Sequence, residues 1–415
     1  MTDWNNRQTS YSYDKNGRLV KTQRPDGSIE TRTYDKAGNL VAIKDVKKDG
    51  TVFNDYTYNY DQSGNITTIT DKSVAKNNQQ TATDSTVQME YDSVNRLIKY
   101  NGKDVRYDAD GNMIYGPLNG EMAMFTYDCR NRLTQVTTDS GETTQYAYDA
   151  ENVSTKVIKN AGTQKETVTT YVTDSVSHEL SRVLETTTTD KIGKTETILY
   201  TYGNGLVAQE KSACTAEESH ATGEYLVYHF NHLGSTTAVT DEAGEIKYTY
   251  TYNIFGKLLS GNYGEVEFLF NGQYGVASDA NGLYYMSARY YNIDIMRFIN
   301  QDILIGSIDS SQSLNRYAYV EGNPVNFLDP FGLDESLYDE LHKKVLGFNF
   351  WLSTFSVSIG WVNITPIGNA VGVALTALHT LAYLYDIGVS INEAWDTVLR
   401  QEWDRMDETY ELYMY

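Results

Sequence analysis

Two histidines and an aspartate form the most suggestive group of chemically active side chains in this sequence. His229 and His232 are separated by two residues, and Asp241 follows them. Such a set could hold a metal ion or carry out acid–base catalysis. Because side chains along a strand alternate between its two faces, however, residues three apart point to opposite sides. We therefore interpret both histidines as structural, and expect neither a metal nor a cofactor.

Other chemical signatures are scarce. Cys129 and Cys214 lack the close spacing of a metal site and cannot form a disulfide framework. His342, beside acidic residues, fits an exposed helix pair, and His379 lies among apolar residues as a core or interface histidine would. The sequence contains no glycine-rich phosphate loop, dinucleotide-binding motif or nucleophile elbow. These features predict neither nuclease nor transferase chemistry.

The charge balance excludes one class of partner. Acidic residues outnumber basic ones by 55 to 34 in a chain of 415 residues, which leaves a net charge of −21. A polyanion of this kind is repelled by nucleic acid, so no nucleic-acid partner is expected. The N-terminus, MTDWNNRQTSYSYDKNG, has no apolar run after a basic start, which argues against a conventional secretory signal peptide.

A short unit that contains Tyr-Asp recurs along the first half of the chain. After the Tyr-Asp pair come about three residues, then Gly-Asn, Gly-Arg or Asn-Arg, then an aliphatic residue or methionine. The copies begin at Tyr13, Tyr34, Tyr60, Tyr91, Tyr107, Tyr127 and Tyr148, the last of which is less regular. Seven copies at a spacing of roughly twenty residues indicate a repeat architecture. The Tyr-Asp pairs are therefore interpreted as structural rather than catalytic.

Each unit has the chemistry of a strand–turn–strand hairpin. The residues before each tyrosine alternate as a strand does, the aspartate can bond to its own backbone, and glycine or asparagine supplies a positive φ. A single hairpin cannot bury its own face, so neighbouring units must stack. The stacked hairpins form a continuous β wall. The Thr-rich stretch Lys156–Lys211 alternates in the same way and is predicted to add strands to this wall. The fold is therefore predicted to be mainly β.

The character of the chain changes after Leu333. Two of its five prolines lie in NPVNFLDPFGL, Asn323–Leu333, and four of its five tryptophans come later. Residues 345–385 contain no Asp, Glu, Lys or Arg, and NITPIGN divides this run into two predicted helices, 345–362 and 367–391. Their lengths approach the roughly 20 residues needed to cross a bilayer. A buried helical hairpin in a small soluble domain explains the same pattern, so both interpretations stay open.

The repeats and the later motifs together resemble the Rhs family. The YDxxGN-type units are similar to its YD repeats, and the remaining motifs follow the order of its Rhs-associated core domain: YHFNHLGSTTAVTDEAG (Tyr228–Gly244), YNIFGK (Tyr252–Lys257), NGQYGVASDANGLYYMSARYYN (Asn271–Asn292), RFINQD (Arg297–Asp302) and NRYAYVEGNPVNFLDPFGL (Asn315–Leu333). The resemblance implies a spiral of β-hairpins that forms a hollow shell, closed by the core domain. It divides the chain into a YD-repeat shell (1–225), a core domain (226–333) and a variable α-helical C-terminal domain (334–415).

The resemblance also implies a self-cleavage site. Members of this family cut their own chain by aspartyl chemistry just after Asp-Pro-x-Gly-Leu, which places the bond here between Leu333 and Asp334. Asp329 matches the second aspartate of the family, and Asp302 is the best match to the first. Arg297 is expected to orient this pair or to stabilise its charge. This chain departs from the family pattern after Asp302, where isoleucine replaces proline, and before Arg297, where methionine replaces glycine.

Two functions from different classes follow from the resemblance. In the first, this is a bacterial polymorphic toxin whose C-terminal segment is released by self-cleavage and acts on a target cell, plausibly at its membrane through residues 345–391. Such a toxin is secreted or delivered to the cell surface and requires a delivery system and a cognate immunity protein. In the second, it is a structural or cell-surface YD-repeat protein, or a truncated remnant, without toxin activity. About 320 residues are few for the family's cage, so an incomplete wall or one completed by a partner is expected.

Overall fold

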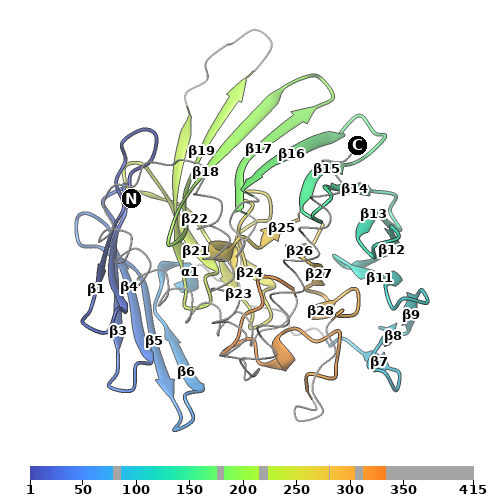
Figure 1. The fold of residues 1–415 in the computed structure, drawn as a ribbon, viewed down its shortest axis with the longest axis horizontal. Helices are drawn as coiled ribbons and strands as arrows, with labels where there is room; N and C mark the ends of the chain where they lie inside the picture. The colour runs from blue at the N-terminus through green and yellow to red at the C-terminus, as the bar shows by residue number, and fades with distance from the viewer. Residues whose placement is uncertain (78–85, 175–181, 215–222, 280, 304–311, 333–415) are drawn as a thin grey trace, which may run out of the picture. The chain divides into compact units, whose positions relative to one another are not determined.

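The fold is mainly β-structure, as predicted. A computed structural model describes residues 1–77, 86–174, 182–214, 223–279, 281–303 and 312–332 (Figure 1). Within these residues the exceptions are the four-residue helix α1 (Val74–Asn77) and two short 3-10 helices, η1 (Gly272–Tyr274) and η2 (Val320–Gly322). The strands form five sheets, in which every paired neighbour is antiparallel.

The two N-terminal sheets follow the order of the chain. The first contains β1 (Ser10–Tyr13), β2 (Leu19–Gln23), β3 (Ile29–Tyr34), β4 (Leu40–Val46), β5 (Val52–Tyr60) and β6 (Ile66–Asp71). The next has three short strands, β7 (Met89–Tyr91), β8 (Leu97–Tyr100) and β9 (Lys103–Asp104). Because each strand pairs with the one before it, every connection within these sheets is a hairpin.

A 13-stranded sheet makes up the largest part of the fold. It contains β10 (Arg106–Tyr107), β11 (Met113–Leu118), β12 (Glu121–Tyr127), β13 (Leu133–Thr138), β14 (Thr143–Tyr148), β15 (Ser154–Lys159), β16 (Thr167–Asp174), β17 (Arg182–Asp190), β18 (Thr195–Gly203), β19 (Gly205–Cys214), β20 (Glu224–Phe230), β21 (Thr236–Asp241) and β22 (Ile246–Thr249). The prediction that the Thr-rich stretch continues the same wall is confirmed. The predicted boundary at residue 225 lies inside β20, where the sheet is continuous.

The Tyr-Asp units form the hairpin turns that their residues predict. In the first unit, Oδ1 of Asp14 accepts hydrogen bonds from the amides of Asn16 and Arg18, each at 2.9 Å. Nε of Arg18 donates to the other carboxylate oxygen at 2.7 Å. The predicted positive φ is confirmed at the fourth turn position in all seven units: Gly17, Gly38, Gly64, Asn95, Gly111, Asn131 and Asn152. Each aspartate therefore closes its own turn.

The tyrosine of a unit binds back to an earlier unit. Tyr34 donates from its hydroxyl group to the backbone carbonyl of Leu19 at 2.9 Å. The same contact recurs in three further pairs: Tyr60–Leu40 at 2.6 Å, Tyr127–Met113 at 3.0 Å and Tyr148–Leu133 at 2.7 Å. This hydrogen bond ties successive hairpins together and gives a physical reason for the tyrosine of the repeat.

The remaining strands lie inside the arc that the 13-stranded sheet describes in Figure 1. They form a pair, β23 (Thr251–Tyr252) and β24 (Leu258–Ser260), and a four-stranded sheet, β25 (Ala277–Ser278), β26 (Leu283–Met286), β27 (Arg289–Asn292) and β28 (Arg297–Phe298). Their side chains fill the largest hydrophobic cluster, where Tyr284 and Tyr291 pack with Tyr228 of β20 and Phe268. This aromatic core joins the four-stranded sheet to the wall and fixes the position of β27.

Candidate active site

The two predicted aspartates, Asp302 and Asp329, converge on Arg289 at the start of β27. Nη2 of the arginine lies 2.6 Å from Oδ2 of Asp302 and 3.7 Å from Oδ2 of Asp329. All three residues are buried. Carboxylates are costly to bury unless a positive charge compensates them, and the guanidinium provides that charge.

Arg289 is positioned by three further contacts. Nη1 donates to the carbonyl of Arg316 at 3.1 Å, and Nε donates to the carbonyl of Gly332. The guanidinium carbon also lies 3.7 Å from the centre of the Phe298 ring. Burial lowers the pKa of Arg289, although the neighbouring carboxylates favour its charged form. Since arginine stays protonated even after a substantial shift, this residue is a fixed positive charge.

The segment that leads to the predicted cleavage site is docked on the turn between β26 and β27. The amide of Ala288 donates to the carbonyl of Phe331 at 3.0 Å. Gly332 adopts a left-handed conformation with a φ of +65°, and a Cβ atom there would lie 2.5 Å from the carbonyl oxygen of Met286. Only glycine fits this slot, so the Gly of the DPFGL motif places the chain against Arg289.

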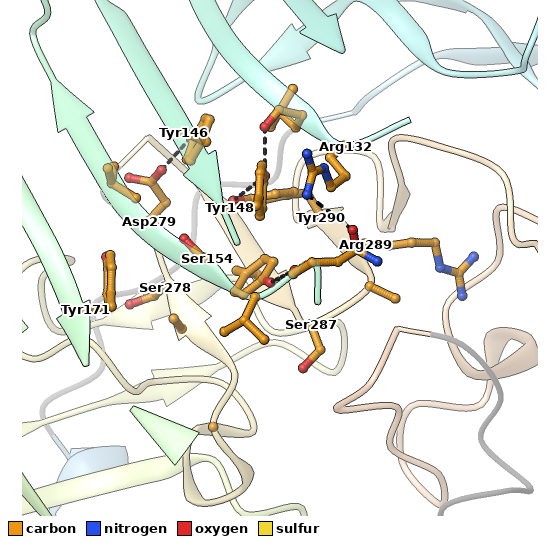
Figure 2. Close-up of a pocket in the computed structure, with 18 of the residues that line it drawn as sticks. Arg132, Tyr146, Tyr148, Ser154, Tyr171, Ser278, Asp279, Ser287, Arg289 and Tyr290 are labelled. Atoms are coloured by element: carbon orange, nitrogen blue, oxygen red, sulfur yellow. Dashed lines mark hydrogen bonds between the residues drawn. The ribbon is translucent and has the colours of Figure 1, made fainter. Parts of the chain in front are cut away.

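A cavity of about 950 Å³ opens beside these residues. Its lining includes Arg289, Asp302 and Phe331, together with side chains from the inner face of the 13-stranded sheet. Figure 2 shows Tyr146 from β14 and Asp279, which follows β25, meeting across this cavity. Because one water molecule occupies about 30 Å³ in the liquid, the cavity has ample room for water next to Asp302.

Another buried carboxylate of the cavity, Asp279, has partners of its own. Its Oδ2 accepts a hydrogen bond from the Tyr146 hydroxyl at 2.5 Å, and its Oδ1 lies 3.3 Å from Nζ of Lys159. Burial, and then the adjacent carboxylate, raise the pKa of Tyr146 well above its usual value, so the phenol remains a donor. Asp279 is therefore a satisfied structural acid and a natural control for Asp302 and Asp329.

The family of the chain follows from its comparison with known sequences. The sequence model of the teneurin YD-shell family matches residues 50–325, more than half of the chain, and that of the RHS repeat matches residues 1–29. The chain belongs to the YD-shell family of RHS-repeat proteins.

Relatives of this YD-shell protein include two bacterial proteins of known activity. It is 27% identical over 341 residues to double-stranded DNA deaminase toxin A of Burkholderia cenocepacia, and 30% identical over 309 residues to the tRNA3(Ser)-specific nuclease WapA of Bacillus spizizenii. The alignments cover 78% and 72% of this chain but only 21% and 12% of those relatives. The chain thus corresponds to a small part of each relative.

The fold of this chain is also present in a solved structure. The crystal structure of TcdB2–TccC3 matches with a TM-score of 0.57 and 19% sequence identity, over 78% of this chain and 20% of that one. Identity at this level shows a shared fold. It agrees with the family assignment made from the sequence.

Arg297 of the YD-shell protein lies away from the two aspartates that it was predicted to orient. Nη1 of Arg297 donates to the carbonyl of Asn95 at 2.5 Å, and its guanidinium carbon lies 4.3 Å from the centre of the Tyr91 ring. It therefore braces a YD turn, and Arg289 is the arginine beside the carboxylates. The sequence contained one signal for Arg289, which is a charged residue within the aromatic run ARYYN. The structure buries all four residues of β27, and a buried charge requires buried partners.

His229 joins the six-stranded sheet to the 13-stranded sheet. This fully buried residue of β20 has its Nε2 atom 2.9 Å from the hydroxyl of Thr240 and its ring between two carboxylates, 3.8 Å from Asp26 and 3.7 Å from Asp45. Burial alone would raise the pKa of Asp45, but Arg24 and His229 lower it to about 2. These contacts agree with the structural interpretation of His229.

His232 and Asp241 also have structural contacts. Nε2 of His232 lies 3.1 Å from the carbonyl of Val325, and its ring packs on Tyr58. Asp241 closes a turn by accepting the amides of Ala243 and Glu245. The three residues therefore do not meet at one site, and among the described residues no cluster of His, Cys, Asp or Glu is suited to a metal.

Several predicted features lie outside the described residues. These are Leu333, Asp334, the C-terminal domain 334–415 with its two predicted helices, and the histidines His342 and His379. Within the part of the chain that the structure describes, no helix is both long and apolar enough to cross a membrane.

Proposed function

We propose that this protein is an RHS-type toxin that cuts its own chain between Leu333 and Asp334. One observation carries the proposal: Asp302 and Asp329 meet at one buried arginine, beside the segment that leads to the predicted bond. Paired carboxylates at a shared site are the groups that aspartyl proteolysis requires.

In the proposed reaction one carboxylate acts as a base and the other as an acid. Asp302, which makes the shorter contact with Arg289, takes a proton from a water molecule as the water oxygen attacks the carbonyl carbon of Leu333. The proposed reaction requires Asp329 to carry a proton beforehand, as one member of the carboxylate pair does in aspartic proteases. Asp329 gives that proton to the nitrogen of Asp334 as the C–N bond breaks. The products are a carboxyl group on Leu333 and an amino group on Asp334.

The docked segment supports this assignment of the bond. Arg289 binds the carbonyl of Gly332, and the scissile carbonyl belongs to the next residue. Gly332 is the last described residue before the proposed bond, and one residue spans at most about 3.6 Å of chain. The adjoining cavity offers a supply of water. Arg289 both compensates the buried charges and holds the substrate segment.

The relatives support the toxin assignment. Those with named activities are a deaminase toxin and nucleases, and the shared fold occurs in a structure of the Photorhabdus luminescens Tc holotoxin pore. The family match ends at residue 325, so the activity of the C-terminal segment does not follow from it. The uncharged run 345–385 supports a membrane target, and an exposed apolar run of this length would aggregate. We propose that a shell encloses the segment until delivery and that an immunity protein protects the producing bacterium.

The size of the chain on a denaturing gel tests the cleavage. We expect the wild-type protein to give two fragments divided near residue 333, and Asp302→Asn and Asp329→Asn to give one intact band. Asp279→Asn removes a buried carboxylate from the same cavity and should leave cleavage unchanged. An intact wild-type chain, or cleavage that survives both Asn substitutions, would refute the mechanism.

The toxin assignment needs a separate test. Bacteria that express the full chain should lose membrane potential, whereas those that express a chain ended at Leu333 should keep it. Equal growth and equal membrane potential in both cultures would instead favour a structural or cell-surface protein without toxin activity.

A further inference from the structure

Arg316 makes hydrogen bonds to both the amide and the carbonyl of Asp302. The amide of Asp302 donates to the carbonyl of Arg316 at 2.8 Å, and Nη2 of Arg316 donates to the carbonyl of Asp302. The same Arg316 carbonyl accepts the hydrogen bond from Nη1 of Arg289 at 3.1 Å. One residue therefore orders both the aspartate and the arginine that it pairs with.

Arg316 is anchored in turn on a YD turn of the wall. Its Nη1 donates to Oε1 of Gln301 at 3.1 Å, and Nε2 of Gln301 donates to the carbonyl of Asp110 at 2.7 Å. The hydroxyl of the neighbouring Tyr317 donates to the carbonyl of Gly111 at 2.9 Å. Asp110 and Gly111 lie in the turn between β10 and β11. This hairpin therefore supports the hydrogen bonds of Arg316 to Asp302, which together form a clamp on that residue.

The two aspartates of the site differ in their local restraint. Asp329 is followed by Pro330, whose ring fixes its own φ and restricts the residue before it to extended conformations. Asp302 is followed by Ile303, which is 77% exposed and imposes no such restriction. The backbone of Asp302 thus relies on contacts from elsewhere in the fold, and Arg316 makes them.

We infer that Arg316 is a positioning residue for the self-cleavage reaction: its contacts with both peptide groups of Asp302 hold that carboxylate against Arg289. The inference rests on the proposed function. Arg316 acts through Asp302, since its side chain donates hydrogen bonds to the backbone of that residue and to Gln301. Misplacing a reacting group by about 1 Å can cost roughly 100-fold in rate.

The rate of cleavage in three variants tests this role. A labelled full chain is made in a cell-free translation system and sampled over time on a denaturing gel. We expect Arg316→Gln to slow cleavage by about 100-fold and Arg316→Lys, which keeps one charged donor, to slow it less. Adding Ile303→Pro to Arg316→Gln should restore part of the rate, because proline supplies a local restraint. Arg18→Gln, which removes an arginine contact in the first YD turn, should cleave at the wild-type rate.

The pH dependence separates a positioning role from a merely structural one. Without the clamp, Asp302 pairs less well with Arg289, so its ionised form is less favoured and the acid limb of the rate profile should move to higher pH. Loss of stability alone would lower the melting temperature and leave that limb in place. A wild-type rate and an unchanged limb in Arg316→Gln would overturn the inference.

Hydrogen–deuterium exchange makes the result independent of the proposed cleavage. In Arg316→Gln, the amide of Asp302 should exchange faster than in the wild type, whereas Arg18→Gln should show no change there. If the wild-type chain is never cut, the proposed function fails, and faster exchange would show that the clamp on Asp302 exists without that reaction. Unchanged exchange in Arg316→Gln would refute the clamp itself.

Discussion

Nη2 of Arg289 lies 2.6 Å from Oδ2 of Asp302, with both side chains buried. A contact of this kind is both an ion pair and a means of orientation, because the planar guanidinium offers several donors in fixed directions. Arg289 uses them on Asp302, on the carbonyl of Gly332 and on the carbonyl of Arg316. Different replacements of Arg289 should therefore separate its two roles, which are compensation of the buried carboxylates and orientation of the groups that it contacts.

Arg289→Lys should preserve the positive charge and lose the geometry. One ammonium group cannot contact all three acceptors, so we expect the protein to fold while cleavage slows by about 10-fold or more. Arg289→Met should lower the free energy of unfolding by about 3–5 kcal/mol, because it leaves buried carboxylates without compensation. Urea unfolding measures the stability, and a denaturing gel measures the cleavage. Wild-type cleavage in both variants would show that Arg289 is not part of the reaction.

Gly332→Ala should displace the segment before the predicted bond. The added Cβ would meet the carbonyl of Met286 at 2.5 Å, and alanine is strained at the φ of +65°. We expect cleavage to slow by about 100-fold. Gly322→Ala is the matched control, because Gly322 has a φ of +81° but has nothing within 4 Å of an added Cβ. Equal cleavage rates in the two variants would contradict a specific role for the Gly332 slot.

Tyr148→Phe should weaken the link between successive hairpins. The lost hydroxyl donates to the carbonyl of Leu133 at 2.7 Å and lies 3.3 Å from the hydroxyl of Tyr290. We expect the free energy of unfolding to fall by about 1–2 kcal/mol, as for other buried hydrogen bonds. Tyr13 of the first unit is 54% exposed, so Tyr13→Phe should cost no more than about 0.5 kcal/mol. Chemical denaturation of both variants compares these values, and equal losses would argue against the link.

The stability of the protein should decrease as the pH falls from about 6.5 to 4. Burial lowers the pKa of His232 to about 4, although its hydrogen bond to the Val325 carbonyl acts in the opposite direction. An unfolded chain, whose histidine has a pKa near 6.5, binds more protons in this range, so acid favours unfolding. We expect this residue to account for about 1–3 kcal/mol between pH 7.5 and pH 4.

His232→Gln tests the source of that pH dependence. The variant should lose less stability than the wild type over the same range, as measured by urea unfolding at several pH values. The pKa of Asp45, about 2, lies below the usual value of about 3.9, so that carboxylate stabilises the protein above pH 4 and loses its contribution below it. The two effects fall in different pH windows. Parallel pH profiles for variant and wild type would refute the role of His232.

The YD turns were predictable because their interactions are local. Asp14 binds amides two and four residues further along, and the left-handed position follows from the residue type at Gly17. A hairpin turn also sets the pairing of its two strands, so the order of the sheets follows from the repeat. The β-class, the continuation of the wall and the family assignment therefore depend on patterns within short segments.

The composition of the site was only partly predictable. Asp302 and Asp329 were identified from motifs, and the structure brings them together. The prediction for Arg297 was wrong about its position, because motif matching places a residue along the chain and says nothing about the direction of its side chain. Arg297 points to Asn95, while Arg289 reaches the carboxylates from another strand.

Arg289 acquires its place from packing between segments that are far apart along the chain. The hairpin β26–β27, the segment that follows β28 and the DPFGL segment each contribute one side of the site. They meet because an aromatic core, which includes Tyr284 and Tyr291, buries β27 against the wall. Because an unpaired charge in that interior would cost several kcal/mol, the buried charged groups are stable only when they pair with one another. Turn chemistry acts over four residues and can be read from the chain, whereas this pairing exists only once distant strands have packed.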